Sequence, residues 1–145
     1  MNTDIKSTLG NKLIWYGVLL LLLGLLTGFA IPALSNPRMG LSSHLEGTLN
    51  GMLLILFGLM WPKLNQSDKM LKWIFGLALY GTFTNWFTTL LAAAWGAGSE
   101  MMPLAGGEGY GTEIQEIIIK FGLISLSLAM IMVCGILLWS LKKKT

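Results

Sequence analysis

His44 is the only histidine of the chain, and it lies near the start of an apolar stretch, residues 39–61, that is long enough to cross a membrane. Glu46 and Asn50 follow in the same stretch, so one expected helix carries an imidazole, a carboxylate and an amide. Polar groups inside a bilayer are costly, and they commonly mark functional sites. Three kinds of chemistry are open to this set: hydrogen bonds between helices, proton transfer, and ligation of a metal ion. A sole histidine excludes sites with several histidine ligands and suits single axial ligation of haem iron.

Helical periodicity divides the polar residues of this stretch between two faces. At about 100° per residue, Gly47 and Gly51 lie near the His44 face. Glycines on that face have two possible uses, which are close approach of another helix and room for a flat group. Glu46 and Asn50, spaced by four, share a different face, and Asn50 lies about 120° around the helix from His44.

The stretch from residue 70 to residue 95 is unusually polar for a membrane span. Tyr80 and Thr88 lie on one face of the expected helix, and Asn85 lies on a neighbouring one. A hydroxyl can bond to its own helix, but an amide in the middle of a span needs a partner from another helix. Trp86 lies deep in the same stretch, where it either packs or lines an aromatic substrate pocket.

The elements that must position these residues are membrane helices. The chain has 145 residues, 54% hydrophobic and only 12% charged, whereas a soluble domain carries about 25% charged residues. Apolar stretches long enough to span a bilayer occur at about 13–34, 39–61, 70–95 and 116–141. We therefore expect a single all-α domain, residues 1–145, folded as an integral membrane four-helix bundle. The glycine-rich segment 96–112 is expected to be either a flexible surface loop or a lid over a pocket.

Charge predicts the orientation and excludes some partners. Three segments carry eight lysines and, with four spans, all fall on one side: Lys6, Lys12, Lys63, Lys69, Lys72, Lys142, Lys143 and Lys144. The opposite side has Arg38 alone, so both termini are expected in the cytoplasm. The net charge of +3 comes from these flanks and gives no reason to expect nucleic acid as a partner. Cys134 is the only cysteine, which excludes an intrachain disulfide and a Cys/His zinc site.

The stretch "HLEGTLNGMLLILFGLMWP" resembles the hydroxylaminobenzene mutase family, and the likeness extends through "LYGTFTNWF" and "AAAWGAG…MMPLAG". With four spans of similar spacing, it covers most of the chain. The layout also resembles styrene oxide isomerase more distantly. In that relative a histidine is followed six residues later by Asn-Gly and then by a proline at the end of the helix. His44, Asn50, Gly51 and Pro62 have the same spacing here.

The resemblance implies a cofactor and an assembly. Styrene oxide isomerases are trimers that hold ferric haem b between neighbouring subunits. On this likeness His44 is the axial ligand of the iron, and Asn50 belongs to the pocket on the open face of the haem. Gly47 and Gly51 then line the haem on the His44 face. A haem between subunits would take His44 from one protomer and Asn50 from the next.

The resemblance also implies a reaction, the redox-neutral isomerisation of hydroxylaminobenzene to 2-aminophenol with ferric iron as Lewis acid. We expect a substrate pocket formed by Trp86, Phe87 and Thr88. Asn50 would orient the substrate nitrogen, Asn85 or Tyr80 would bond the developing amine, and Glu46 would shuttle protons. Tyr80 stands where styrene oxide isomerases have an aspartate, so the roles of their third helix do not transfer directly.

The expected setting is a multi-pass protein of the bacterial inner membrane, a homotrimer in contact with lipid, acting on a small aromatic substrate in nitroaromatic degradation. Three other interpretations remain open from the sequence. One is an epoxide isomerase of the styrene oxide type. The second is a non-catalytic haem-binding membrane subunit, which the single histidine disfavours because b-type electron carriers commonly use two. The third is a haem-free helical scaffold or small transporter.

Overall fold

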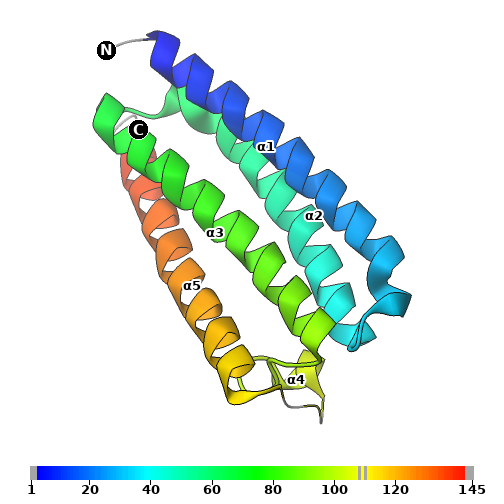
Figure 1. Ribbon diagram of the computed structural model, residues 1–145. Helices are drawn as coiled ribbons and strands as arrows, with labels where there is room; N and C mark the ends of the chain where they lie inside the picture. Colours follow the sequence, from blue (N-terminus) through cyan, green and yellow to red (C-terminus); the bar gives the residue numbers. More distant parts are fainter. Residues whose placement is uncertain (1–2, 108, 110, 143–145) are drawn as a thin grey trace.

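The computed structural model describes residues 3–107, 109 and 111–142. Four long helices make up most of it: α1 (Thr3–Ala30), α2 (Pro37–Met60), α3 (Asp68–Trp95) and α5 (Glu113–Lys142) (Figure 1). Three short elements connect them, the 3-10 turns η1 (Ile31–Ala33) and η2 (Trp61–Lys63) and the one-turn helix α4 (Pro103–Gly106). No strand occurs in this part of the chain. The predicted all-α class is confirmed.

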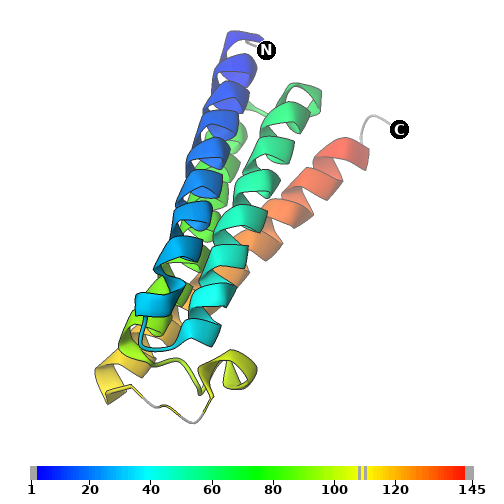
Figure 2. The ribbon, with the colours of Figure 1, turned by 90° about the vertical axis from the view of Figure 1, so that its right-hand side faces the viewer.

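The long helices run alternately up and down, but they do not close into a bundle. Helices α1, α2 and α3 pack against one another, whereas α5 packs extensively only against α3. In the view of Figure 2, α5 diverges from α2 toward the end that carries the C-terminus. The expected four-helix bundle is therefore not confirmed for the single chain. An apolar helix in lipid does not need protein on every side, because acyl chains can cover the surface that its neighbours leave open.

The basic segments gather at one end of the molecule, as their spacing predicts. The start of α1, the turn between α2 and α3, and the end of α5 lie together in Figure 1. Lys6, Lys63 and Lys142 belong to these three segments; Lys143 and Lys144 lie outside the described residues. The opposite end carries η1, α4 and the glycine-rich segment. The cytoplasmic location of the basic end stays a prediction.

Three of the helices are long and apolar enough to cross a membrane. Among the described residues they are Ile5–Ala33, Pro37–Lys63 and Glu113–Lys142, with mean hydropathies of 2.2, 1.2 and 2.5. The expected span at residues 70–95 is not among them, although α3 has 28 residues. Its threonines, asparagine and lysines lower its hydropathy, so α3 is a helix of suitable length but of mixed character.

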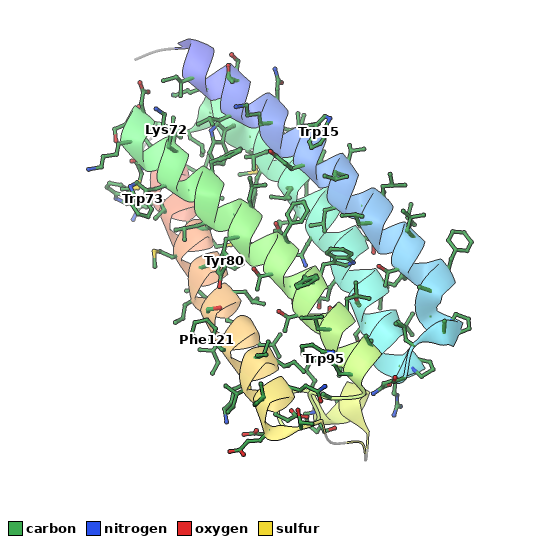
Figure 3. The ribbon with its side chains drawn as sticks, in the orientation of Figure 1. Trp15, Lys72, Trp73, Tyr80, Trp95 and Phe121 are labelled. Atoms are coloured by element: carbon green, nitrogen blue, oxygen red, sulfur yellow. The ribbon has the colours of Figure 1, made fainter. Side chains whose placement is uncertain are left out.

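Large apolar side chains cover the outer surface of the long helices. Phe29, Phe121, Ile131 and Leu138 are each at least 70% exposed, and Trp15 and Trp73 near the basic end are more than 60% exposed (Figure 3). A soluble protein rarely exposes so much contiguous apolar surface. The exposed faces therefore fit contact with lipid.

The described residues of the segment 96–112 contact the ends of three helices. Gly96, with φ 66°, ends α3 in the left-handed conformation that glycine tolerates. The Asn36 side chain caps α2 through Met39 N, and its Nδ2 donates to the carbonyls of Ala105 and Gly106, each at 3.0 Å. The carboxylate of Glu116, on the first turn of α5, accepts the backbone N–H groups of Gly98 and Gly111 at 2.8 and 3.1 Å.

Helices α1 and α2 approach each other through two facing rows of glycine. Gly10, Gly17 and Gly24 of α1 meet Gly58, Gly51 and Gly47 of α2. A Cβ atom on Gly47 would lie 2.5 Å from the Gly24 Cα, and one on Gly51 would lie 2.6 Å from the Leu21 backbone nitrogen. The chain's own α1 therefore fills the groove beside Gly47 and Gly51, which is the other use of glycine stripes in membranes. Their expected contact with a flat cofactor stays a prediction.

The replacement Gly51→Ala is expected to destabilise the protein. A new Cβ there would meet the α1 backbone, which cannot move without separating the two helices, and such overpacking costs about 1–3 kcal/mol. Gly76→Ala is the matched control, because no atom lies within 4 Å of its added Cβ and alanine favours a helix interior over glycine by about 0.5–1 kcal/mol. Thermal unfolding in detergent measures both. A Gly51→Ala protein as stable as the Gly76→Ala protein would contradict the tight interface.

The buried apolar residues form two clusters, with polar side chains between them. The larger lies toward the basic end and includes Leu54, Trp61 and Ile74, and the smaller includes Met39 and Ala93 near the segment 96–112. Residues 43–50 of α2 and 82–89 of α3 fall between these clusters along their helices. Their buried polar members are Ser43, Asn50, Thr82, Thr88 and Thr89. This polar layer in the middle of the helices is the candidate site.

Candidate active site

A carboxylate joined to two amides lies between α2 and α3. Glu46 Oε2 accepts a hydrogen bond from Asn50 Nδ2 at 3.0 Å and another from Asn85 Nδ2 at 2.6 Å. Asn50 is 8% exposed, and Glu46 and Asn85 are partly buried. The pairing of Glu46 with Asn50 follows from their spacing of four residues on one helix. The partner that Asn85 needs from another helix is Glu46.

The imidazole of His44 is held by α1. Its Nδ1 lies 2.8 Å from the backbone carbonyl oxygen of Gly24. A carbonyl can only accept a hydrogen bond, so Nδ1 is the protonated nitrogen, and Nε2 of the neutral ring keeps its lone pair. A histidine that binds a metal is typically oriented by such a hydrogen bond, which its other ring nitrogen donates to a carbonyl or carboxylate. The imidazole is partly buried and its orientation fits a single nitrogen ligand to iron.

The chain does not bring His44 and the Glu46–Asn50–Asn85 cluster together on one face of α2. His44 is bonded to α1 through Gly24, whereas Glu46 accepts hydrogen bonds from Asn85 of α3 and from Asn50 of its own helix. The two groups thus lie against different neighbouring helices, in agreement with the angle of about 120° expected from helical periodicity.

Two of the three expected pocket residues share a hollow. Trp86 and Phe87 line a surface hollow of about 300 Å³ together with Phe83 and Thr84, and the centroids of the Trp86 and Phe87 rings are 6.3 Å apart. Trp86 Nε1 donates to Thr27 Oγ1 of α1 at 3.0 Å. Thr88 does not join them, because it is 5% exposed and packs against Gly122 of α5. Thr88 therefore does not line this hollow in the single chain, and its part in substrate binding stays a prediction.

Tyr80 also lies apart from the cluster. Its hydroxyl is 2.7 Å from Ser125 Oγ of α5, so the side chain lies on the α5 side of α3 (Figure 3). Asn85, five residues further along, bonds toward α2 instead. Of the two residues expected to bond a developing amine, only Asn85 belongs to the carboxylate–amide cluster.

Sequence reasoning missed the residues that support this site from α1 and α2. Gly24 supplies the carbonyl that orients His44, Thr27 holds the Trp86 indole, and Ser43 donates to the Trp86 carbonyl at 3.1 Å. The sequence does carry one signal that would have found the first, because Gly10, Gly17 and Gly24 recur every seven residues. A seven-residue glycine repeat facing the glycines of the next helix predicts the close contact that brings the Gly24 carbonyl to His44.

Among the described residues, no group of three or more His, Cys, Asp or Glu side chains is arranged to hold a metal ion. The site thus offers one imidazole, one carboxylate, two amides and an aromatic hollow.

Comparisons with known proteins show the family of the chain. The family model described as styrene oxide isomerase matches residues 9–142. The chain belongs to the styrene oxide isomerase family. It is an isomerase, and two relatives in Ectopseudomonas oleovorans carry more specific names. Hydroxylaminobenzene mutase HabB is 56% identical over 136 residues, 94% of this chain and 83% of the relative. Hydroxylaminobenzene mutase HabA is 47% identical over 114 residues, 79% of this chain and 84% of the relative.

No solved structure matches this member of the styrene oxide isomerase family. The matched range covers α2, α3 and α5 in full and α1 from residue 9, and with them His44, the carboxylate–amide cluster and the aromatic hollow. Each part of the candidate site therefore lies within the portion of the chain that the family model covers.

Proposed function

We propose that this isomerase converts hydroxylaminobenzene to 2-aminophenol. The observation that carries the proposal is the 56% identity, over 94% of the chain, to a protein named hydroxylaminobenzene mutase. The reaction moves oxygen from nitrogen to the adjacent ring carbon, so one N–O bond breaks, one C–O bond forms, and no electrons enter or leave overall. The substrate is a small, largely apolar arene, which suits a site inside an apolar helical protein.

We further propose that His44 holds the iron of a haem through Nε2. The hydrogen bond from Nδ1 to the Gly24 carbonyl supports this role, because it fixes the ring and leaves Nε2 as the ligating nitrogen. When bound there, ferric haem supplies a Lewis acid that stabilises negative charge on the departing oxygen. The resemblance of His44, Asn50, Gly51 and Pro62 to the styrene oxide isomerase pattern supports haem b as the proposed cofactor.

The chain's own residues bind and orient the arene. Trp86 and Phe87 offer ring faces that can stack on an aromatic ring and stabilise positive charge on it. Asn85 precedes Trp86 in α3, and Glu46 links it to Asn50 of α2, so both amides can bond the substrate nitrogen. The surrounding apolar helices exclude the water that would otherwise trap a cationic ring.

We propose that the complete site forms between subunits of a homotrimer in the bacterial inner membrane, with both termini in the cytoplasm. The support is the separation, within one chain, of His44, which is bonded to α1, from Asn50, which is bonded to Glu46 in the cluster shared with α3. A haem carried on the His44 side of one protomer would then meet Asn50 of the next. The apolar faces left open on the single chain provide surface for that contact.

The experiment is turnover by detergent-purified protein. Hydroxylaminobenzene is incubated at neutral pH without air, reductant or oxidant, and the products are separated by liquid chromatography. We expect 2-aminophenol as the main product, with none formed by the buffer alone. A requirement for a reductant, or no product from a folded sample, would contradict the proposal.

An epoxide isomerase is the second candidate, because the family model is described as styrene oxide isomerase. It predicts conversion of styrene oxide to the isomeric aldehyde at a rate comparable to that with hydroxylaminobenzene. Offering both substrates to the same preparation decides between them.

A further inference from the structure

The two amides of the candidate site have a fixed orientation because they share one carboxylate oxygen. Asn50 Nδ2 and Asn85 Nδ2 both donate to Glu46 Oε2, at 3.0 and 2.6 Å. A carboxylate only accepts hydrogen bonds, so the NH₂ end of each amide must face Glu46 and each amide oxygen must point elsewhere.

Three oxygen acceptors remain available around this cluster. Within the described residues, no donor bonds to Glu46 Oε1, Asn50 Oδ1 or Asn85 Oδ1. None of these three oxygens is fully enclosed by protein atoms. One belongs to a carboxylate, and hydrogen bonds to a charged acceptor are about twice as strong as neutral ones. An accessible carboxylate oxygen inside an apolar helix pair is a site for an N–H or O–H donor.

We propose that Glu46 selects the substrate by accepting a hydrogen bond from its N–H group through Oε1. This role rests on the proposed function, which assigns the cluster to the substrate pocket, and it replaces the expected role of Glu46 as a proton shuttle. An arylhydroxylamine carries N–H and O–H donors, whereas an epoxide carries only an acceptor oxygen. Glu46 Oε1 therefore favours the first class and repels the second, because two acceptor oxygens facing each other are left unpaired.

Glu46 also acts as a positioning residue for Asn50 and Asn85. Without a carboxylate between them, each amide is free to turn its oxygen end toward the other helix. The replacement Glu46→Gln separates the two roles. Its amide oxygen can still accept from both asparagines, but the atom that replaces Oε1 becomes an NH₂ donor. The variant keeps the geometry of the cluster but presents a hydrogen-bond donor, in place of an acceptor, to the ligand.

The test compares the binding of aniline with that of N,N-dimethylaniline, which keeps the ring and nitrogen but has no N–H. Neither amine carries the N–OH group, so the protein cannot convert either one. The two affinities are measured by calorimetry on detergent-purified protein. We expect the wild type to prefer aniline by about ten- to a hundredfold, the range typical of one hydrogen bond to a charged group. In Glu46→Gln this preference is expected to fall to about threefold or less, and any binding of the amines to haem is common to both proteins.

Thr48→Ala is the matched control. It removes a hydroxyl of α2 that bonds only to backbone carbonyls of its own helix, and it leaves the carboxylate in place. We expect it to retain the wild-type preference for aniline. Equal affinities of the wild type for the two amines, binding of neither, or a preference that survives in folded Glu46→Gln would each overturn the proposal. Equal affinities of the wild type for the two amines would overturn the proposal even where the variant does not fold.

The proposed role of Glu46 and the proposed mutase function can each fail without the other. A protein that prefers aniline in a Glu46-dependent way but does not convert hydroxylaminobenzene supports the donor site and contradicts the mutase assignment. A protein that makes 2-aminophenol but shows no Glu46-dependent preference supports the mutase assignment and contradicts this role of Glu46.

Discussion

The variant His44→Ala is expected to fold but to lose both bound haem and mutase activity. His44 is the only imidazole of the chain, and its Nε2 is left free by the hydrogen bond from Nδ1 to the Gly24 carbonyl. Removing an outer partner of a metal ligand commonly costs ten- to a hundredfold in affinity, so removal of the ligand itself is expected to cost more than about a hundredfold. The absorption spectrum in the Soret region and the ratio of haem to protein measure the loss.

Two controls accompany this variant. Thr48→Ala changes a neighbouring side chain whose hydroxyl bonds only to backbone carbonyls of its own helix, and it is expected to keep its haem. Imidazole added to His44→Ala should restore part of the Soret band by binding in the space left by the side chain. A Soret band of wild-type intensity and position in His44→Ala alone would show that another group ligates the iron.

Mixed oligomers of His44→Ala and Asn50→Ala are expected to regain activity that neither variant has alone. The physical reason is the placement of the two residues, because His44 is bonded to α1 and Asn50 lies in the cluster that faces α3. If the site forms between protomers, a mixed oligomer contains interfaces at which His44 of one chain meets Asn50 of the other. The two variants are co-expressed with different affinity tags, purified through both, and assayed for 2-aminophenol.

The matched control is His44→Ala co-expressed with a second copy of His44→Ala, again under two tags, which can form no native interface and should stay inactive. Mixed oligomers that form in good yield but remain as inactive as this control would show that His44 and Asn50 act within one chain.

The polar residues of α2 were largely predictable from the sequence. Helical periodicity separated His44 from Asn50 and paired Glu46 with Asn50, and the hydrogen bonds of the structure follow that division. The need of Asn85 for a partner on another helix was equally predictable from the cost of an unpaired amide in a membrane. The identity of that partner, Glu46, was not predictable. Periodicity describes one helix at a time and does not give the rotation of the neighbouring helix.

The roles of Gly47 and Gly51 could not be decided from α2 alone. A glycine stripe suits a flat group and a close helix equally well, and the choice between them depends on what lies opposite. The structure places Gly17 and Gly24 there. The repeat in α1 was visible in the sequence, and pairing the two stripes would have predicted the interface.

The aromatic pocket was predicted in part, for a geometric reason. Successive residues of a helix lie about 100° apart, so Trp86, Phe87 and Thr88 cannot all face one site. Trp86 turns toward α1 and Thr88 toward α5, with Phe87 exposed between them. The polar character that makes α3 a source of site residues also makes it the one long helix whose hydropathy does not identify it as a span.

The most direct test of the proposed reaction is the fate of the oxygen atom. Hydroxylaminobenzene labelled with ¹⁸O in the N–OH group is converted by the purified protein in ordinary water, without reductant, and the 2-aminophenol is analysed by mass spectrometry. An isomerase that moves the hydroxyl oxygen within one substrate molecule, in a site closed to water, retains the label in the product. Product that carries oxygen from the solvent would contradict the account.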